Sequence, residues 1–374
     1  MKIESFELER SQSLWENRVD YNLTESGVHP YNIKEIMNQD EIDELLSLRI
    51  GYGQTNGSIE LRETINNLYP SSNIDQILVT NGSAEANFIS MWSLLKPEDE
   101  LVLMLPNYMQ IWGIANSFGV KVKPFYLMFE DNWEPDLSEL QELISDKTKM
   151  IAVCNPNNPT GAILEERDMH EIVNLAKEVD AWVYSDEVYS GVRIDGGIED
   201  PTFWGMYDKT IVCNGLAKSY ALPGLRIGWL TGPEEFIEEV WGYHDYTSIS
   251  TGIISQQIAS LVLKPNLRKR ILERNRNILK TNLSTLTKWL DQRSEIFEYV
   301  PPRAGGMVFI KYDLDINSTE LARKLREEKS VLVVAGDCFG MDNYIRLGIG
   351  SEEEYFLKGL SLIDEKLYEL ISDS

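Results

Sequence analysis

The sequence predicts an α/β fold, in which a mostly parallel sheet carries helices on both faces and is joined to a smaller α+β domain. One observation is alternation: apolar strand-like runs such as 100–105 and 150–154 take turns with helical patterns such as 137–145 and 165–179. Alternation of this kind indicates parallel strands whose crossover connections are helices. The other observation is that polar motifs follow several of these runs, at the sheet edge where open α/β sheets bind their ligands.

The chain has 374 residues, which is enough for one large and one small domain. We expect an N-terminal arm with a small-domain segment at 1–46, a large ligand-binding domain at 47–264, and an interdomain helix with a C-terminal small domain at 265–374. Hydrophobic residues make up 43% and charged residues 25% of the chain, as is typical of a soluble globular protein.

The formal net charge is −25, from 60 acidic and 35 basic residues. Nucleic acid and anionic membranes would both repel such a chain, so neither is expected as a partner. Neither a secretion signal nor an apolar run long enough to cross a bilayer is evident, and we expect a cytoplasmic protein. Three cysteines and three histidines are scattered without the spacing of a disulfide framework or a zinc site, so no metal is expected.

Apolar periodicity and glycine or proline breaks set the expected elements in chain order. Before residue 70 they are an amphipathic arm at 5–15, a loop at 22–30, a helix at 33–46, a glycine-rich loop at 51–57 and a helix at 58–69. In the large domain they are strands at 77–80, 100–105, 120–125, 150–154, 182–183 and 210–213, with helices at 86–95, 137–145 and 165–179. A long helix at 265–293, whose many basic residues indicate a solvated face, precedes strands and a helix at 318–329 in the small domain.

Four motifs carry the chemistry. The longest, N-G-L-A-K-S-Y-A-L-P-G-L-R-I-G-W, follows the strand at 210–213 and holds Lys218 and Arg226. T-N-G-S-A-E-A follows the strand at 77–80, and its glycine turn into a helix N-terminus presents free N–H groups that suit a phosphate. The phosphate candidates there are Gly82, Ser83 and Ala84. The other two motifs are N-P-N-N-P-T-G at 155–161 and Y-S-D-E-V-Y at 184–189.

In this order and at these separations, the four motifs resemble those of the class I/II aminotransferases, fold type I enzymes that use pyridoxal 5′-phosphate (PLP). The resemblance runs from Leu23 to Gly350. It implies that the large domain binds PLP on a sheet of the seven-stranded type. It also implies transfer of an amino group between an α-amino acid and a 2-oxo acid by a ping-pong route.

The resemblance implies a role for each motif residue. Lys218 corresponds to the lysine that holds the cofactor covalently and moves the proton as general base and acid. Asp186 corresponds to the carboxylate at the pyridine nitrogen, and Tyr189 and Asn158 to the hydrogen-bonding partners of the 3′ oxygen. Arg226 corresponds to a phosphate ligand.

Further site residues follow from the same resemblance. Tyr108 matches the aromatic ring that lies flat on the pyridine, although a buried core tyrosine remains the alternative. Tyr52 matches the residue that reaches the phosphate of a neighbouring subunit, and the Y-T-S segment ending at Ser248 matches another interface loop, which implies a homodimer. Arg346 matches the arginine that grips the substrate carboxylate, with a structural ion pair as the alternative.

The family folds the segment 22–30 over the substrate, so Gly27 is expected near the substrate carboxylate, and Asn158 is also expected to contact the substrate. The sequence departs from many relatives before the lysine, where Gly215, Leu216 and Ala217 stand in place of hydroxyl residues. Asn214 or Ser83 is expected to take over the missing phosphate contact.

Two alternatives to transamination stay open. The same cofactor and the same first step serve lyases, eliminations and cyclisations, and no residue in the sequence separates them from transaminases. A PLP-sensing transcriptional regulator needs a DNA-binding module before the first family segment, and only about twenty residues precede it here; the acidic balance also opposes DNA binding.

Overall fold

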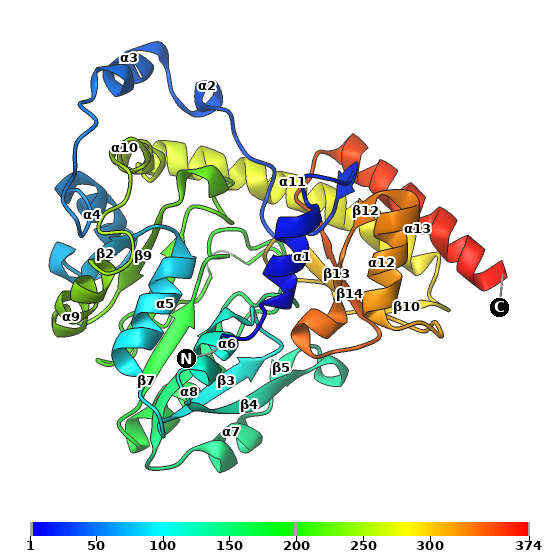
Figure 1. Ribbon diagram of the computed structural model, residues 1–374, viewed down its shortest axis with the longest axis horizontal. Helices are drawn as coiled ribbons and strands as arrows, with labels where there is room; N and C mark the ends of the chain where they lie inside the picture. Colours follow the sequence, from blue (N-terminus) through cyan, green and yellow to red (C-terminus); the bar gives the residue numbers. More distant parts are fainter. Residues whose placement is uncertain (1–2, 198–199, 373–374) are drawn as a thin grey trace.

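The computed structural model describes residues 3–197 and 200–372 (Figure 1). The outermost residues of the expected first and last domains, 1–2 and 373–374, lie outside this range. A large sheet with its helices forms one body, and a smaller sheet with two helices forms the other (Figure 1). Whether the domain boundaries fall at residues 46 and 264 stays a prediction.

The large sheet has eight strands in the order β2-β9-β8-β7-β6-β3-β4-β5. All neighbouring pairs from β8 through β4 are parallel, whereas β9 runs antiparallel to both β8 and β2. The eighth strand, β5, has only two residues and pairs antiparallel at the edge, so it adds little to the seven-stranded sheet that we expected. The strands are β2 (Ile77–Thr80), β3 (Glu100–Leu105), β4 (Lys121–Met128), β5 (Glu134–Pro135), β6 (Thr148–Cys154), β7 (Trp182–Asp186), β8 (Thr210–Gly215) and β9 (Gly228–Thr231).

Helices cover both faces of this sheet, which confirms the expected α/β fold. Strand side chains alternate between the faces, so Leu101 and Leu103 join one buried cluster while Val102 and Met104 join another. The first cluster includes side chains of α5, α6 and α9, and the second includes those of α7 and α8. These helices are α5 (Ser83–Leu94), α6 (Gln110–Ser117), α7 (Leu137–Leu143), α8 (Glu166–Glu178) and α9 (Glu234–His244).

The small body is built on a four-stranded antiparallel sheet in the order β10-β11-β14-β13. The 27-residue helix α11 crosses from the large body to the small one (Figure 1). The remaining elements are α10 (Ile253–Val262), α11 (Pro265–Asp291), β10 (Phe297–Tyr299), β11 (Met307–Tyr312), α12 (Ser318–Lys329), β12 (Val331–Leu332), β13 (Val334–Ala335), β14 (Tyr344–Gly348) and α13 (Glu353–Ser372).

The N-terminal segment joins the two bodies. Helix α1 lies between them (Figure 1), and the short strand β1 pairs with β12 of the small body. The expected helix at 33–46 is divided into α2 and α3, because Met37 is extended and the Asn38 side chain caps the second helix by accepting from the backbone N–H of Glu41. The elements here are α1 (Glu7–Trp15), β1 (Tyr21–Asn22), α2 (Ile33–Ile36), α3 (Gln39–Ser47) and α4 (Ile59–Asn66).

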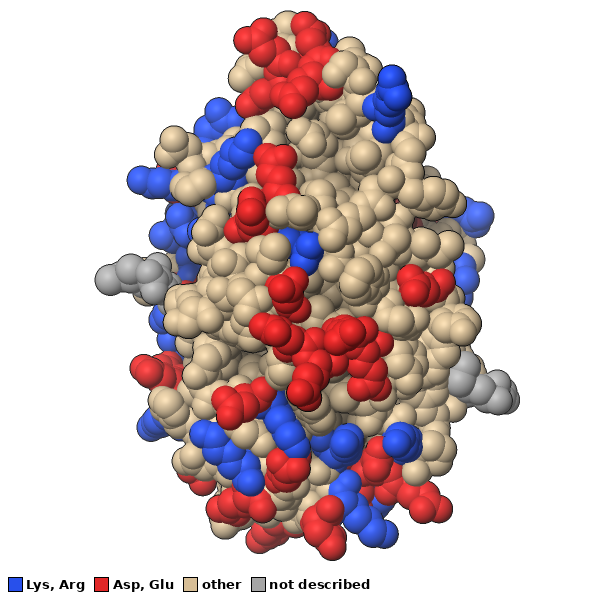
Figure 2. All heavy atoms as spheres, turned by 90° about the vertical axis from the view of Figure 1, so that its left-hand side faces the viewer, with Lys and Arg blue, Asp and Glu red and all other residues tan. Residues whose placement is uncertain are grey.

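Acidic side chains gather in patches on the face that carries α3 and α9, with one group at the top where α3 lies (Figure 2). Helix α3 contributes Asp40, Glu41, Asp43 and Glu44 to that group. None of the helices described here is long and apolar enough to cross a membrane.

Candidate active site

A cavity of about 320 Å³ opens at the carboxyl edge of the large sheet. The strands β2, β6, β7 and β8 all end at this edge, because β9 is antiparallel to both of its neighbours and thereby leaves β2 parallel to β8. The four sequence motifs therefore meet there. Nine of the predicted site residues line the cavity: Ser83, Ala84, Tyr108, Asn158, Asp186, Tyr189, Lys218, Arg226 and Arg346.

Lys218 lies three residues beyond β8 and points at an acid from the N-terminal loop. Its Nζ donates to Oε1 of Glu25 at 2.7 Å, and the same oxygen accepts from the backbone N–H of Gly27 at 2.9 Å. Burial lowers the pKa of Lys218, but the charge of Glu25 and the neighbouring Tyr189 outweigh it, so the pKa lies above its usual value. The lysine is therefore held as a cation in this state of the protein.

Asp186 is the last residue of β7 and is 6% exposed. Its carboxylate accepts from the backbone N–H of Val188 at 3.3 Å and from the side-chain amide of Asn87 at 3.4 Å. Burial raises its pKa to about 6, although these hydrogen bonds and the charge of Lys218 oppose the rise. A buried carboxylate of this kind favours a cationic group placed beside it.

Tyr189 follows Asp186 by three residues and is buried. Its hydroxyl lies 2.9 Å from the hydroxyl of Ser26, in the loop that also carries Glu25. Burial raises the pKa of Tyr189 to about 12, so it stays a neutral hydrogen-bonding group at ordinary pH.

The N-terminus of α5 forms an anion cradle with Arg226. Gly82 has a φ of +81°, and a Cβ on it would overlap the guanidinium of Arg226. Gly228 lies equally close to the backbone of Ser83. Arg226 itself has a φ of +51°, a left-handed conformation that non-glycine residues adopt rarely and often at functional sites. Free N–H groups, the helix dipole and a guanidinium at one point suit a phosphate.

Arg346 comes from the middle of β14 in the small body and is 1% exposed. Its Nη1 donates to Oδ1 of Asn158 at 2.7 Å and its Nη2 to the carbonyl oxygen of Thr24 at 2.6 Å. Its Nε has no hydrogen-bond partner among the described residues. Burial lowers its pKa, as expected for a cation held out of water. Such a group calls for an anion, because a buried unpaired donor of a charged side chain is costly.

Tyr108 follows β3, and residues at the start of the N-terminal helix hold its side chain in place. Its hydroxyl donates to Oε1 of Glu9 at 2.7 Å, and the Phe6 ring packs edge-on against its ring with centroids 4.9 Å apart. The ring of Tyr108 forms part of the cavity wall.

Three predicted residues are absent from the lining of this cavity. Gly82 lies behind Arg226, and Gly27 packs its backbone against Ala217 and Lys218. Tyr52 is 86% exposed and lies away from the cavity of its own chain. Of the two substitutes for the missing hydroxyl contact, Ser83 lines the cavity, whereas the Asn214 side chain accepts from the next residue's N–H. Thr247 bonds to Glu85 of the same chain, near the start of α5.

Sequence reasoning missed residues of the N-terminal segment and one of α5. Glu9, Thr24, Glu25 and Ser26 each bond to a predicted site residue, and Asn87 bonds to Asp186. The only signal for Glu25 and Ser26 in the sequence was their place in the segment expected to fold over the substrate.

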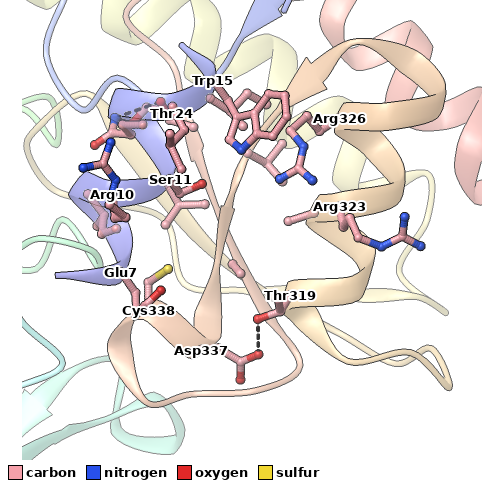
Figure 3. A pocket seen from close by; sticks show the side chains of 18 residues that line it. Glu7, Arg10, Ser11, Trp15, Thr24, Thr319, Arg323, Arg326, Asp337 and Cys338 are labelled. Carbon is pink, nitrogen blue, oxygen red and sulfur yellow. Dashed lines mark hydrogen bonds between the residues drawn. The ribbon is translucent and has the colours of Figure 1, made fainter. Parts of the chain in front are cut away.

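A second cavity of about 280 Å³ lies between α1 and α12 (Figure 3). Trp15 and Arg326 contact each other in its lining, with the guanidinium carbon 4.2 Å from the centroid of the indole ring. Leu8 and Gln12 contribute to both cavities, so α1 separates the two.

The fold and this arrangement define a class, the PLP-dependent enzymes of fold type I, because the residues present fit the cofactor at each end. The cradle at α5 suits the phosphate, and the buried carboxylate of Asp186 and the amine of Lys218 suit the ring nitrogen and the aldehyde. The sequence model described as "Aminotransferase class I and II" matches residues 27–358, and the chain belongs to this family. Its cofactor is PLP.

Related proteins cover nearly the whole chain. A solved PLP-dependent aminotransferase from Streptococcus suis has a TM-score of 0.93 and 34% identity, with 99% of both chains covered. Capreomycidine synthase from Streptomyces vinaceus is 26% identical over 92% of this chain and 89% of its own length. Aromatic-amino-acid aminotransferase 2 from Thermococcus litoralis is 26% identical over 85% of this chain and 84% of its own.

Proposed function

We propose that the protein is a transaminase that moves an amino group between an α-amino acid and a 2-oxo acid by a ping-pong route. The observation that carries the proposal is that Lys218 and the buried, partly unpaired Arg346 line one cavity. A base for the Cα proton and an anchor for the α-carboxylate are the two groups that this reaction needs from the protein. Bound PLP would supply the electron sink for the electron pair that remains on Cα after the proton is removed.

Lys218 acts as the base and acid. The cationic amine must first lose a proton. Glu25, whose Oε1 lies 2.7 Å from the Nζ, affects that loss because its charge raises the pKa of Lys218. Once neutral, the Nζ of Lys218 would be the group that takes the proton from Cα of a bound amino acid and later gives it back.

Asp186, Tyr189 and Asn158 orient and tune the cofactor ring. The Asp186 carboxylate keeps a proton on the pyridine nitrogen, because an adjacent anion favours the cationic form. The hydroxyl of Tyr189 and the side-chain N–H of Asn158 would serve the 3′ oxygen, since the Asn158 carbonyl oxygen already accepts from Arg346. Tyr108, which lines the cavity, would stack against the ring.

Gly82, Ser83, Ala84 and Arg226 bind the phosphate. The backbone N–H groups at the start of α5 would donate to its oxygens, and the guanidinium of Arg226 would add a charge-assisted bond. The Ser83 hydroxyl replaces the hydroxyl that many relatives carry before the lysine.

Arg346 binds the substrate carboxylate through its unpaired Nε, held in place by Asn158 and Thr24. The backbone of Gly27 lies close to Lys218 and Ala217, where an added side chain would crowd both residues. We therefore assign this backbone to the same carboxylate.

The test is a half-reaction screen. Purified holoenzyme is mixed with single amino acids, and conversion of the cofactor absorbance to that of the pyridoxamine form is followed together with 2-oxo acid release. Conversion by at least one amino acid is expected, and Lys218→Ala should abolish it, whereas Lys209→Ala, a surface lysine paired with Asp180, should retain it. Absence of conversion with every amino acid would contradict the proposal.

A cyclisation or elimination is the second candidate, because capreomycidine synthase is among the relatives. The same screen separates the two functions. A transaminase leaves the cofactor in its amino form and yields a 2-oxo acid, whereas a cyclase or lyase returns the cofactor unchanged and yields a product that keeps its nitrogen or releases ammonia.

We also propose a homodimer that completes each site across its interface. Leu46 near the end of α3 and Ile50 and Tyr52 in the loop after it are 78%, 84% and 86% exposed, and Tyr246, which follows α9, is 82% exposed. A hydrogen bond from the indole N–H of Trp241 in α9 to the hydroxyl of Thr55 at 2.9 Å joins the two segments. Figure 2 shows a broad area without charged side chains on this face. Contiguous exposed apolar residues indicate a contact surface.

A further inference from the structure

The α1 side of the cavity is acidic. Helix α1 and the residue that ends it contribute Leu8, Glu9, Gln12 and Glu16 to the lining. Glu9, Gln12 and Glu16 are three and four positions apart, which places them along one face of the helix. One face of α1 therefore presents two carboxylates to the substrate cavity.

This face is fixed toward the cavity by two contacts besides helix packing. The hydroxyl of Tyr108 donates to Glu9 at 2.7 Å. The side-chain amide of Gln12 donates to the hydroxyl of Thr24 at 2.8 Å, and Thr24 in turn accepts from Arg346 through its carbonyl oxygen. The orientation of α1 is thus coupled to the residue proposed to bind the substrate carboxylate.

Four carboxylates line the cavity: Glu25 pairs with Lys218, Asp186 is proposed to face the ring nitrogen, and Glu9 and Glu16 remain without such a role. Three basic residues line it: Lys218, which pairs with Glu25, Arg226 at the phosphate cradle, and Arg346. Neither Glu9 nor Glu16 makes an ion pair with any residue that the structure describes. Carboxylates without a cationic partner beside a partly enclosed cavity attract a cation, because the low-dielectric walls weaken screening.

Arg346 supplies the independent observation of a ligand. It is 1% exposed, lines the same cavity, and has an Nε without a partner among the described residues. A carboxylate of the ligand would satisfy that donor. An amino acid bound in this way has one end fixed, and its side chain is left to meet the remaining lining, which includes the carboxylates of α1.

We propose that the amino-acid substrate has a cationic side chain, ending in an ammonium or a guanidinium group, and that Glu9 and Glu16 recognise that cation. This inference rests on the proposed function, because it takes Arg346 as the carboxylate anchor. A second carboxylate on the substrate would meet like charge at α1 and is disfavoured.

The test measures binding without turnover. Holoenzyme is reduced with borohydride, and the affinities of arginine, lysine, norleucine and glutamate are determined by calorimetry. Norleucine has the length of lysine without the charge. Arginine or lysine is expected to bind at least about tenfold more tightly than norleucine, and glutamate more weakly than either, as one or two charge-assisted hydrogen bonds imply.

The variants assign the effect to α1. Glu9→Gln is expected to weaken binding of the cationic amino acid about tenfold, and Glu16→Gln less, because Glu16 is more exposed and screened. Both should leave norleucine affinity unchanged. Glu7→Gln is the matched control, since Glu7 lies on the same helix but lines the other cavity (Figure 3). Melting curves establish that each variant is folded.

Equal affinities for arginine, lysine and norleucine, a preference for glutamate, or no binding by any of the four would overturn the inference. A cationic preference that survives both substitutions would overturn it as well, because the recognition would then lie elsewhere. These outcomes are distinct from failure of the proposed function, which appears in the half-reaction screen as the absence of conversion with every amino acid.

Discussion

The side-chain amine of Lys218 and the carboxylate of Glu25 lie 2.7 Å apart, although 193 residues separate them in the chain. Glu25 belongs to the N-terminal loop, which also supplies Ser26 to Tyr189 and Thr24 to Arg346. The loop therefore contacts the proposed base, a proposed cofactor ligand and the proposed substrate anchor together.

The first prediction concerns this pair in the cofactor-free protein. Glu25 keeps the pKa of Lys218 above its usual value, so the amine is protonated and unreactive below that pKa. Glu25→Gln removes the anion and leaves the effect of burial, so the pKa of Lys218 should fall. The reactive amine at pH 8 should increase about tenfold for each unit of that fall.

Labelling with an amine reagent, followed by mass spectrometry of the peptide that holds Lys218, measures the change. Lys209, which pairs with Asp180 on the surface, serves as the control in the same digest and should label equally in both proteins. Equal labelling of Lys218 in wild type and Glu25→Gln would show that the pair does not govern its protonation.

The contacts of Glu25 also show why part of the site could be predicted and part could not. Lys218, Asp186 and the N-terminus of α5 follow strands of one parallel sheet, and strand alternation alone predicts that such residues converge. Arg346 and Tyr108 were placed by resemblance to the family. The fold class, the family and the cofactor are confirmed, whereas the roles of individual residues stay predictions.

The N-terminal contacts carry no comparable signal. Thr24 and Arg346 are 322 positions apart, and their bond depends on how the small body packs against the loop. Glu9 lies on a helix whose apolar spacing predicts an amphipathic arm but does not predict which element it covers. The break between α2 and α3 likewise depends on a local cap at Asn38, which competes with the apolar periodicity that suggested one helix.

The second prediction concerns Asp186. Asp186→Asn preserves the shape of the side chain but removes the charge that keeps the pyridine nitrogen protonated. Cofactor should remain bound, whereas conversion by amino acid in the half-reaction should slow about 100-fold or more, as loss of a proton-linked catalytic group implies. Stopped-flow absorbance measures the rate. A half-reaction as fast as that of wild type would refute the role assigned to this residue.

The third prediction concerns Arg346. Arg346→Lys keeps the charge but cannot keep the hydrogen bonds to Asn158 and Thr24 while also binding a carboxylate. Affinity for the amino acid should fall by roughly 1.5–3 kcal/mol, the value of a charge-assisted bond, with cofactor content unchanged. Saturation of the half-reaction gives the affinity. Arg303→Lys, which changes a surface arginine paired with Glu165, is the control. Unaltered saturation in Arg346→Lys would argue against the anchor.

The fourth prediction concerns pH and Glu187, which is 2% exposed and accepts from the backbone N–H of Phe203 at 3.0 Å. Burial raises its pKa from 4.5 to about 7. Ionising the Glu187 carboxyl therefore costs more free energy in the folded protein than in the unfolded chain. The contribution of Glu187 to stability is therefore complete below about pH 4.5 and is lost as the pH rises through 7, by about 3 kcal/mol.

Glu187→Gln keeps an acceptor for Phe203 and removes the titration. The free energy of unfolding is measured with urea on the cofactor-free proteins at pH 5 and at pH 8. Its decrease from pH 5 to pH 8 should be smaller in the variant than in wild type. Asp186, whose pKa is also raised, titrates in both proteins, so some pH dependence should remain in the variant. Parallel pH profiles would place the pKa of Glu187 near its ordinary value.

The last prediction concerns Tyr52, which is 86% exposed and outside the lining of its own chain's cavity. If it binds the phosphate in the partner's site, Tyr52→Phe should weaken PLP retention without unfolding the protein. Complementation between two inactive variants tests directly whether Tyr52 acts in the partner's site. Lys218→Ala lacks the amine and Tyr52→Asp places a carboxylate at the phosphate, so each homodimer should be inactive.

Mixing and re-associating the two variants creates heterodimers with one site that has both its own Lys218 and the partner's Tyr52. Random pairing makes half of the dimers mixed and gives each one active site of two, so activity should return to about a quarter of wild type. A tyrosine that served its own chain would restore nothing, because each site would then carry one of the two substitutions. Inactive heterodimers whose subunits are verified as folded and paired would therefore remove the case for a shared site.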